Sequence, residues 1–127
     1  MNLIDTDVLI DYLHKIEIAE KFLESIRANE DDLIISIITR MELIQGCRNK
    51  REMFVILDIL EEFQLIHITE QISWKAEELM ENYTMSHGLL IPDAIIAATA
   101  INMDLVLYSR NVRHFSIIDG LKLLKPY

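Results

Sequence analysis

The sequence predicts an α/β fold of the three-layer α/β/α kind, in which helices cover both faces of a central, mainly parallel sheet of about four to five short strands. Short, wholly apolar segments are typical of strands buried on both faces. They alternate with longer segments whose apolar residues recur every 3.6 residues, as in amphipathic helices. Strands separated by helices form parallel sheets, so the alternation indicates this layered fold. The length of 127 residues suits one hydrophobic core, and we expect residues 1–127 to form a single domain.

The first half of the chain supplies three of the predicted strands. Residues 2–4 and 33–38 are short apolar runs, and the Ile-rich second run is too short for an independent helix. Residues 65–68 are a candidate third strand. Helices are expected over residues 8–13, 19–26, 39–44 and 53–63.

The second half of the chain predicts two helices followed by two strands. An amphipathic helix over residues 72–83 should end near His87 and Gly88. A proline then opens an apolar, alanine-rich helix over residues 93–102, which we expect to be central and buried. The last strands are expected at residues 105–108 and, as an edge strand, at residues 116–118.

The composition excludes several classes of protein. No apolar run approaches the ~20 residues needed to cross a bilayer, and the first residues do not form a basic leader followed by an apolar segment. The single cysteine, Cys47, cannot form an intramolecular disulfide, which fits a reducing compartment. We therefore expect a cytoplasmic protein that does not enter a membrane.

The charge balance is unusual for a nucleic-acid-binding protein. The formal net charge is -9, whereas such proteins are usually basic. An acidic protein can still act on RNA if a divalent metal neutralises its carboxylates and local cations contact the phosphates. Six Lys and Arg residues are candidate contacts for the RNA phosphates, although residues of this kind are more commonly solvated surface charges. The candidates are Arg40, Arg48, Lys50, Arg51, Arg110 and Arg113.

Polar residues follow three of the predicted strands, at the edge where ligands bind in open α/β sheets. Asp5 ends the first strand, residues 36–42 follow the second, and residues 109–111 follow the fourth. If these strands are neighbours, their polar residues converge on one edge of the sheet. Asp93 begins the apolar helix, and its position in the sequence alone does not place it there.

Each acidic residue also has a purely structural interpretation. Asp5 or Thr6 would cap the first helix, and Thr39 with Glu42 fits a capping box. Asp93 follows a proline at a helix start, where the helix dipole stabilises a carboxylate by roughly 0.3–1 kcal/mol. These roles do not explain why the wholly apolar first strand ends in an aspartate. A turn residue such as Gly or Asn would end the strand equally well.

Four segments of the chain resemble, in the right order, the motifs of VapC-type PIN domains, the ribonuclease toxins of VapBC toxin–antitoxin pairs. The segments span residues 3–13, 36–46, 90–100 and 107–115. The resemblance implies a PIN-like fold, an endoribonuclease activity on RNA phosphodiester bonds, a homodimer and a cognate antitoxin. It also implies that the catalytic and metal-binding acids are Asp5, Glu42 and Asp93.

The fourth segment departs from the family pattern. The family often has aspartates at the positions of Asn111 and His114. An amide brings no negative charge, so the site should hold metal less tightly. We expect Thr6, Ser109 and Asn111 to support the metal ligands without binding the metal directly, and we interpret His114 as a surface residue.

The chemistry of three neighbouring carboxylates favours a bound cation. Two carboxylates about 4 Å apart repel each other by roughly 4 kcal/mol at an effective dielectric of 20. Oxygen ligands favour Mg²⁺ or Mn²⁺, and no Cys or His grouping has zinc spacing. Asp5 and Asp93 would bind the ion directly, with Glu42 acting through water or at a second ion. Such an ion would make water a nucleophile for RNA hydrolysis at neutral pH.

Two other functions remain open at this point. A haloacid-dehalogenase-type phosphatase also begins with two aspartates separated by one residue, as Asp5 and Asp7 are, but Leu9 stands where that family has Thr or Val. A PIN-like module that has lost catalysis and only binds a partner is the second alternative, and Asn111 is its best support. The sequence does not identify the RNA or its cleavage site.

The sequence predicts two features that an antitoxin would bind. A cluster of carboxylates in a protein of net charge -9 attracts an Arg side chain, which would compete with metal. The predicted helix that bears Met53, Phe54 and Leu57 is a candidate wall for a groove that takes an amphipathic segment, although such stripes more commonly pack in a core.

Overall fold

The computed structural model describes residues 1–127 as seven helices around one five-stranded sheet. The elements are β1 (Asn2–Ile4), α1 (Thr6–Leu13), α2 (Glu17–Ala28), β2 (Leu33–Ser36), α3 (Ile37–Gln45), α4 (Lys50–Leu60), β3 (Gln64–Ile66), α5 (Glu70–His87), α6 (Ile91–Asn102), β4 (Val106–Tyr108), α7 (Val112–Phe115) and β5 (Lys122–Leu124). None of these helices combines the length and the apolar character needed to cross a membrane.

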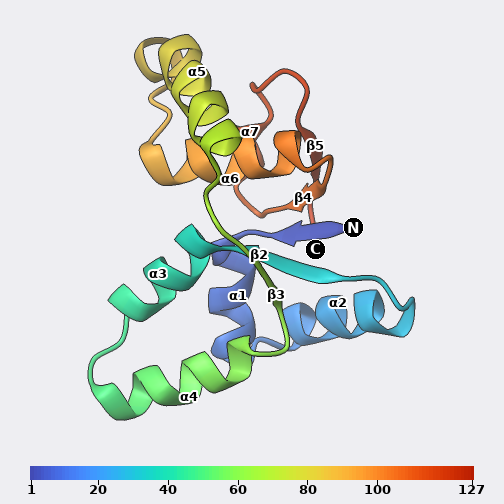
Figure 1. The fold of residues 1–127 in the computed structure, drawn as a ribbon. Coiled ribbons are helices and arrows are strands. Elements are labelled where there is room, and N and C mark those ends of the chain that lie inside the picture. Colours follow the sequence, from blue (N-terminus) through green and yellow to red (C-terminus); the bar gives the residue numbers. More distant parts are fainter.

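The sheet is parallel throughout, with the strand order β3-β2-β1-β4-β5. The central strand β1 pairs with β2 through Leu3 and Ile34, and with β4 through Ile4 and Tyr108. Figure 1 shows the sheet crossing the middle of the molecule with helices above and below it. The predicted fold class, including four to five strands and a parallel arrangement, is therefore confirmed.

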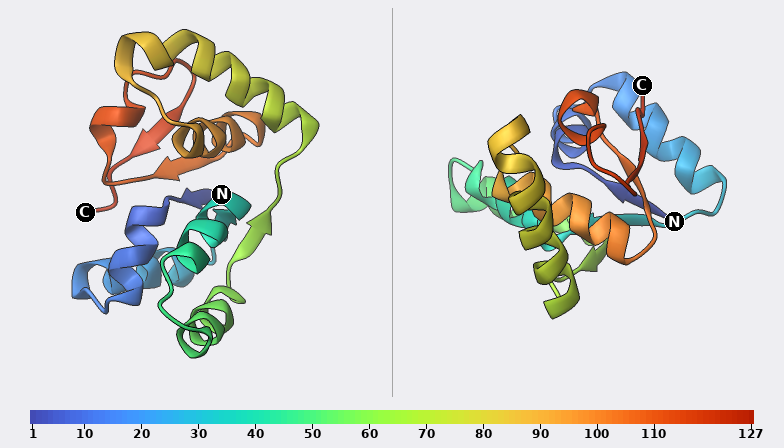
Figure 2. Two further views of the ribbon diagram at one scale, coloured as in Figure 1. Left: turned by 90° about the vertical axis from the view of Figure 1, so that its left-hand side faces the viewer. Right: turned by 90° about the horizontal axis from the view of Figure 1, so that it is seen from above.

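The two faces of the sheet pack against different helices. On one face, Leu3 and Leu107 join a core of fifteen buried residues with α5, α6 and α7. On the other face, Ile4 and Ile35 join a second core of ten residues with α1 to α4. The alternation of side chains along each strand divides the apolar residues between these two layers. The left view in Figure 2 shows the same two groups of helices on opposite sides of the strands.

Two of the predicted strands differ clearly from the structure, and both differences have local causes. The apolar run at residues 33–38 predicted one strand, but the Ser36 hydroxyl accepts a hydrogen bond from Ile38 N and caps α3, so the helix begins at Ile37. The expected edge strand at residues 116–118 is wrong, because this segment is a turn that buries Ile118 in the core shared with α5 and α6. The edge strand is β5 at Lys122–Leu124.

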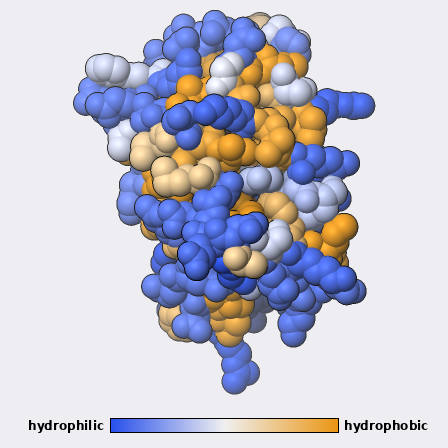
Figure 3. Space-filling model, turned by 90° about the vertical axis from the view of Figure 1, so that its right-hand side faces the viewer, coloured by the Kyte–Doolittle hydropathy of each residue, from blue (hydrophilic) through white to orange (hydrophobic).

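The predicted alanine-rich helix is central, as expected. In α6, six residues are buried, four of them alanines, and α5 packs along it. Apolar side chains also reach the surface on this half of the molecule. Figure 3 shows apolar atoms gathered in the upper half of one face, on the side of the sheet covered by α5 to α7.

Candidate active site

The strand order brings the carboxyl ends of β1, β2 and β4 to one edge of the sheet. From β1 the chain builds outward to β2 and β3 on one side, then returns to add β4 and β5 on the other. The reversal lies beside β1, and ligands of open α/β sheets bind at such a reversal. Asp5 follows β1 directly, and Ser109 follows β4 directly. The two residues are therefore neighbours although they are far apart in the sequence.

Asp5 is the most deeply buried carboxylate at this edge, with 6% of the residue exposed. Its Oδ1 accepts a hydrogen bond from the backbone N–H of Thr6 at 2.8 Å, which caps α1. Its Oδ2 accepts a hydrogen bond from the Ser109 hydroxyl at 2.6 Å. The structural and the functional interpretations of Asp5 are thus compatible, because one oxygen caps the helix while the other is held by the loop after β4.

The environment of Asp5 disfavours its charged form. The pKa of Asp5 is raised from 3.8 to about 7, mainly by burial, then by the negative charge of Asp7 and, to a smaller extent, by that of Asp93. The hydrogen bonds from Ser109 and Thr6 act in the opposite direction. A buried carboxylate with a raised pKa beside like charges is typical of functional sites, where a cation or proton relieves the repulsion.

Glu42 joins the same edge through Thr6. The Thr6 hydroxyl donates to Glu42 Oε1 at 2.8 Å and lies within 2.9 Å of the hydroxyl of Thr39, which is fully buried. The capping-box interpretation of Thr39 and Glu42 is wrong, since Ser36 caps the helix and Glu42 is held by Thr6. The sequence did not indicate Thr39 as part of the site. Its position three residues before Glu42, on the same helix face, is the signal that identifies it.

Asp93 approaches the site from the other layer of helices. It lies in the first turn of α6, and burial raises its pKa, while His114 opposes that shift. His114 Nδ1 lies 3.7 Å from Asp93 Oδ2, with about half of the His114 side chain exposed. The expectation that His114 is only a surface residue is therefore incomplete, because its ring also faces Asp93.

The loop after β4 is bound to α1 by a residue that sequence reasoning passed over. Asp7 Oδ2 accepts the backbone N–H of Arg110 at 3.0 Å, and Asn111 N donates to the Ser109 hydroxyl at 2.9 Å. Asn111 precedes α7, and its side chain makes no capping bond. The repeated acidic residues in α1, two and six positions after Asp5, were the available signal for these contacts.

The predicted cationic residues divide into paired and unpaired groups. Arg48 forms an ion pair with Glu52, and Arg110 pairs with Asp11. The others have no ion pair; they are Arg40, Lys50, Arg51 and Arg113. Arg40 lies on α3, two residues before Glu42, and Arg113 lies on α7 next to His114.

A groove of about 720 Å³ runs between α1, α3 and α4, and Glu42 is among the residues that line it. Its apolar wall on α4 consists of Val55, Ile56 and Ile59. Met53, Phe54 and Leu57, which the sequence suggested for this role, do not line it. They lie on other faces of the same helix.

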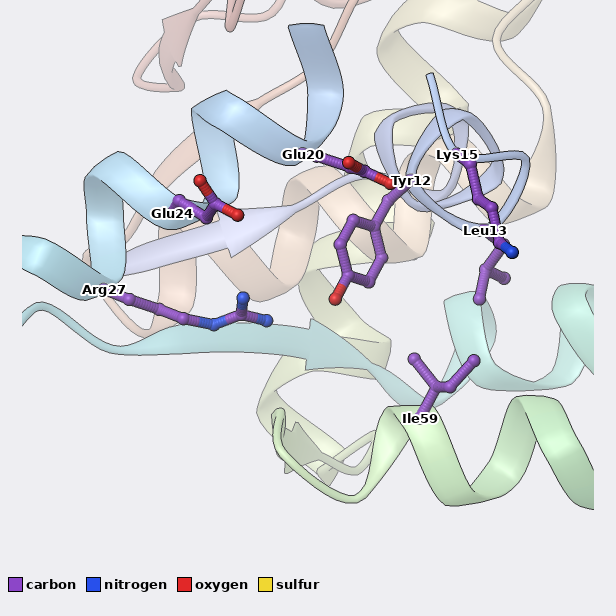
Figure 4. A pocket seen from close by; sticks show the side chains of 7 residues that line it. All are labelled: Tyr12, Leu13, Lys15, Glu20, Glu24, Arg27 and Ile59. Carbon is purple, nitrogen blue, oxygen red and sulfur yellow. The ribbon is translucent and has the colours of Figure 1, made fainter. Parts of the chain in front are cut away.

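A smaller hollow of about 350 Å³ contains none of the expected site residues. Figure 4 shows that Tyr12 and Arg27 point toward one another there, and the guanidinium carbon lies 5.8 Å from the ring centroid. The residues around this hollow are Tyr12, Leu13, Lys15, Glu20, Glu24, Arg27 and Ile59. Its acidic and basic groups are balanced, so it does not compete with the carboxylate edge as a metal site.

The groups at the carboxylate edge fit a small, hard cation. The donors are carboxylate and hydroxyl oxygens, and Asp7 Oδ1 is buried without a hydrogen-bond partner. No three His, Cys, Asp or Glu side chains converge into a complete metal cage. Mg²⁺ is commonly held by one or two carboxylates and keeps several waters, so Asp5 together with Asp93 suits it.

Comparison with known families gives the same result as the geometry. The sequence model of the PIN domain family matches residues 3–121, which is nearly the whole chain. The chain belongs to the PIN-domain family. The expected family is therefore confirmed, and the carboxylate edge described above is the edge of a PIN domain.

Individual relatives of this PIN domain are named as ribonucleases or belong to a toxin-antitoxin complex. It is 38% identical to "Ribonuclease VapC10" of Mycobacterium tuberculosis over 125 residues, covering 96% of this chain and 91% of that protein. It is 33% identical to "Ribonuclease VapC19" of the same species, covering both chains completely. Among solved structures, a chain of a toxin-antitoxin complex from Klebsiella pneumoniae matches with a TM-score of 0.82 and 32% identity, covering 100% of this chain and 98% of that one.

Proposed function

We propose that this PIN domain is a divalent-metal-dependent endoribonuclease, the toxin of a VapBC-type toxin–antitoxin pair, with Mg²⁺ or Mn²⁺ as its cofactor. The observation that carries the proposal is the pair of partly desolvated carboxylates, Asp5 and Asp93, at the reversal of the sheet. Relatives named as VapC ribonucleases, similar over nearly the whole chain, support the activity on RNA.

In this proposal the side chains divide the work between binding and positioning. Asp5 and Asp93 bind the cation, and Glu42, oriented by Thr6, contacts it through water or binds a second ion. Ser109 holds Asp5 by its hydroxyl, and Asn111 N fixes that hydroxyl. When bound, the cation would activate a water molecule for attack on phosphorus and stabilise the leaving oxygen. No protein nucleophile is required.

The RNA backbone would be bound by cationic side chains around the acidic edge. Arg40 and Arg113 have no ion pair in the chain, which leaves their donors available for phosphate oxygens. Lys50 and Arg51 are exposed at the start of α4, and Arg48 would exchange its Glu52 partner for phosphate. Arg110 would contact phosphate with the guanidinium donors that its ion pair with Asp11 leaves free. A net charge of -9 implies that non-specific binding to RNA is weak and depends on the metal.

The antitoxin would occupy the groove between α1, α3 and α4. The groove has an apolar floor and includes Glu42, so an amphipathic segment bound there could place an Arg side chain at the carboxylates. A solved relative with 32% identity is part of a toxin-antitoxin complex, which supports a partner of this kind.

We also propose that the protein forms a homodimer in the cytoplasm. Trp74, Leu90 and Ile91 are more than 60% exposed on the half of the molecule formed by α5 and α6. Exposed apolar groups of this size commonly mark an interface between proteins. The free thiol of Cys47 is consistent with a reducing compartment.

The test is expression of the chain in cells with and without its upstream neighbouring gene, together with purified-protein cleavage assays. We expect growth arrest by the wild-type chain alone, relief by the neighbour, and RNA cleavage that EDTA abolishes and Mg²⁺ restores. Glu17→Gln, an exposed carboxylate on α2, is the matched control and should behave as wild type. Absence of metal-dependent cleavage with retained binding of the neighbour's product would support the catalytically inactive module, for which Asn111 is the specific observation.

A further inference from the structure

Two acidic residues of α1 that lie outside the proposed metal ligands hold the loop of residues 109–111. Asp7 accepts the backbone N–H of Arg110. Asp11, one turn further along the helix, accepts the Arg110 guanidinium at Oδ2, 2.7 Å away. The backbone and the side chain of one residue are thus attached to the helix that Asp5 caps.

Tyr127 completes the attachment of Arg110. Its hydroxyl donates to the same Asp11 oxygen at 2.7 Å, and the Arg110 guanidinium lies over the Tyr127 ring, 5.8 Å from its centroid. The ring packs edge-on against Phe22 of α2, with 6.1 Å between centroids. Arg110 is therefore bound by a carboxylate and by an aromatic face, although half of its side chain is exposed.

The neighbour of Arg110 in the chain makes the contact that matters for the site. Ser109 donates to Asp5 Oδ2 at 2.6 Å, and this hydroxyl in turn accepts the backbone N–H of Asn111. A hydrogen bond weakens steeply as its length and angle depart from the optimum. A shift of this loop by about 1 Å would therefore release the oxygen of Asp5 that the loop holds.

We propose that Asp11 and Tyr127 are positioning residues: by holding Arg110 they fix the loop of residues 109–111, so that Ser109 orients Asp5 for a divalent cation. The effect of the loop on cation binding rests on the proposed metal-dependent function. The attachment of the loop itself is measurable without metal. Neither Asp11 nor Tyr127 contacts the metal ligands, so both act through Arg110.

The test uses four variants of the full chain and two measurements that need no RNA. Arg110→Ala removes the side-chain contacts with Asp11 and Tyr127 and leaves the backbone hydrogen bond to Asp7. Asp11→Asn weakens the ion pair, and Tyr127→Phe removes only the hydroxyl and keeps the ring. Arg110→Lys keeps the charge and serves as the rescue variant. The measurements are Mn²⁺ affinity by calorimetry and the exchange rates of the Arg110 and Asn111 amide hydrogens by NMR, the latter in metal-free protein.

The matched control is Asp104→Asn, which breaks an ion pair of the same 2.7 Å length, with Lys122, away from the loop. We expect Arg110→Ala to weaken Mn²⁺ binding and speed both amide exchange rates by about five- to tenfold, and Tyr127→Phe by about twofold. Asp104→Asn should leave both quantities unchanged, and Arg110→Lys should recover part of the loss.

Two results would overturn the positioning role, and a third would overturn the proposed metal site. Exchange rates and Mn²⁺ affinity that are unchanged in Asp11→Asn and Arg110→Ala would overturn the positioning role, as would faster exchange with unchanged affinity. Equal Mn²⁺ binding by wild type and by Asp5→Asn would instead overturn the proposed metal site, whatever the loop variants do.

Discussion

Asp5 and Asp93 are the two proposed ligands of one cation, yet the protein holds them in opposite ways. Asp5 follows the central strand, is almost fully buried, and receives hydrogen bonds on both oxygens. Asp93 stands on α6 in the other layer, about a fifth of its side chain is exposed, and its charged neighbour is His114. Burial raises the pKa of both carboxyls, and Asp5 reaches about 7.

The difference shows how the two layers share the site. Asp5 is fixed by the strand, the helix it caps and the loop after β4, so its geometry is set by the fold. Asp93 depends on how α6 lies against the sheet and on one half-exposed histidine. We therefore expect substitutions on the Asp5 side to change both stability and metal binding, and those on the Asp93 side to change mainly metal binding.

The largest effect should come from removing either charge. Asp5→Asn and Asp93→Asn should each lower RNA cleavage at saturating Mg²⁺ by at least about a hundredfold, because each removes a proposed ligand and little volume. The fold should persist, as measured by circular dichroism. Cleavage by either variant at the wild-type rate would exclude that residue from the metal site.

The metal-free protein should be less stable at neutral pH than in mild acid because of Asp5. The folded state raises its pKa from 3.8 to about 7, so between these values the native state binds a proton that the unfolded state has lost. Stability is therefore fully present below about pH 4 and is lost as the pH rises to 7, by about 4 kcal/mol from this group.

Asp5→Asn isolates this contribution. In urea unfolding with EDTA, the variant should be more stable than wild type at pH 8. Its free energy of unfolding should fall much less than that of wild type between pH 4 and 7. Asp93→Asn, the matched comparison in the more exposed carboxyl, should change the profile much less. A wild-type profile that rises over this range would contradict the buried position of Asp5.

A smaller effect is expected from restoring a charge on the loop. Asn111→Asp adds a carboxylate to the residue whose backbone N–H donates to the Ser109 hydroxyl, at a position where the family often has one, and should tighten Mg²⁺ binding by roughly tenfold. Calorimetric titration with Mg²⁺ measures this directly. Unchanged or weaker affinity would mean that residue 111 does not face the cation.

The smallest effect should follow from His114→Ala. The histidine lowers the pKa of Asp93, so its loss raises that pKa and lets protons compete better with metal. Because His114 is half exposed, we expect only about a two- to fivefold loss of Mn²⁺ affinity at pH 6 and almost none at pH 8. An equal loss at both pH values would point to a direct contact between His114 and the metal.

The sequence predicted the Asp5 side of the site better than the Asp93 side. Asp5 and Ser109 directly follow apolar strands, and parallel strands bring such ends together, so local pattern was sufficient. The approach of Asp93 and His114 depends on the packing of α6 and α7 across the sheet, which periodicity does not define. The error at residues 116–118 has the same origin, since an apolar triplet in a buried turn has the pattern of a short strand.

The pairing of β1 with β4 also sets when the active site can form during synthesis. Asp5 and Ser109 are 104 residues apart, and a ribosome needs about 5 to 20 s to cover that length. Throughout this time one side of the central strand has no partner and Asp5 has no hydroxyl to orient it. The groove residues between α1 and α4 are made earlier. In the proposed function, the residues of the antitoxin's groove are therefore synthesised before Ser109, which completes the site that cuts RNA.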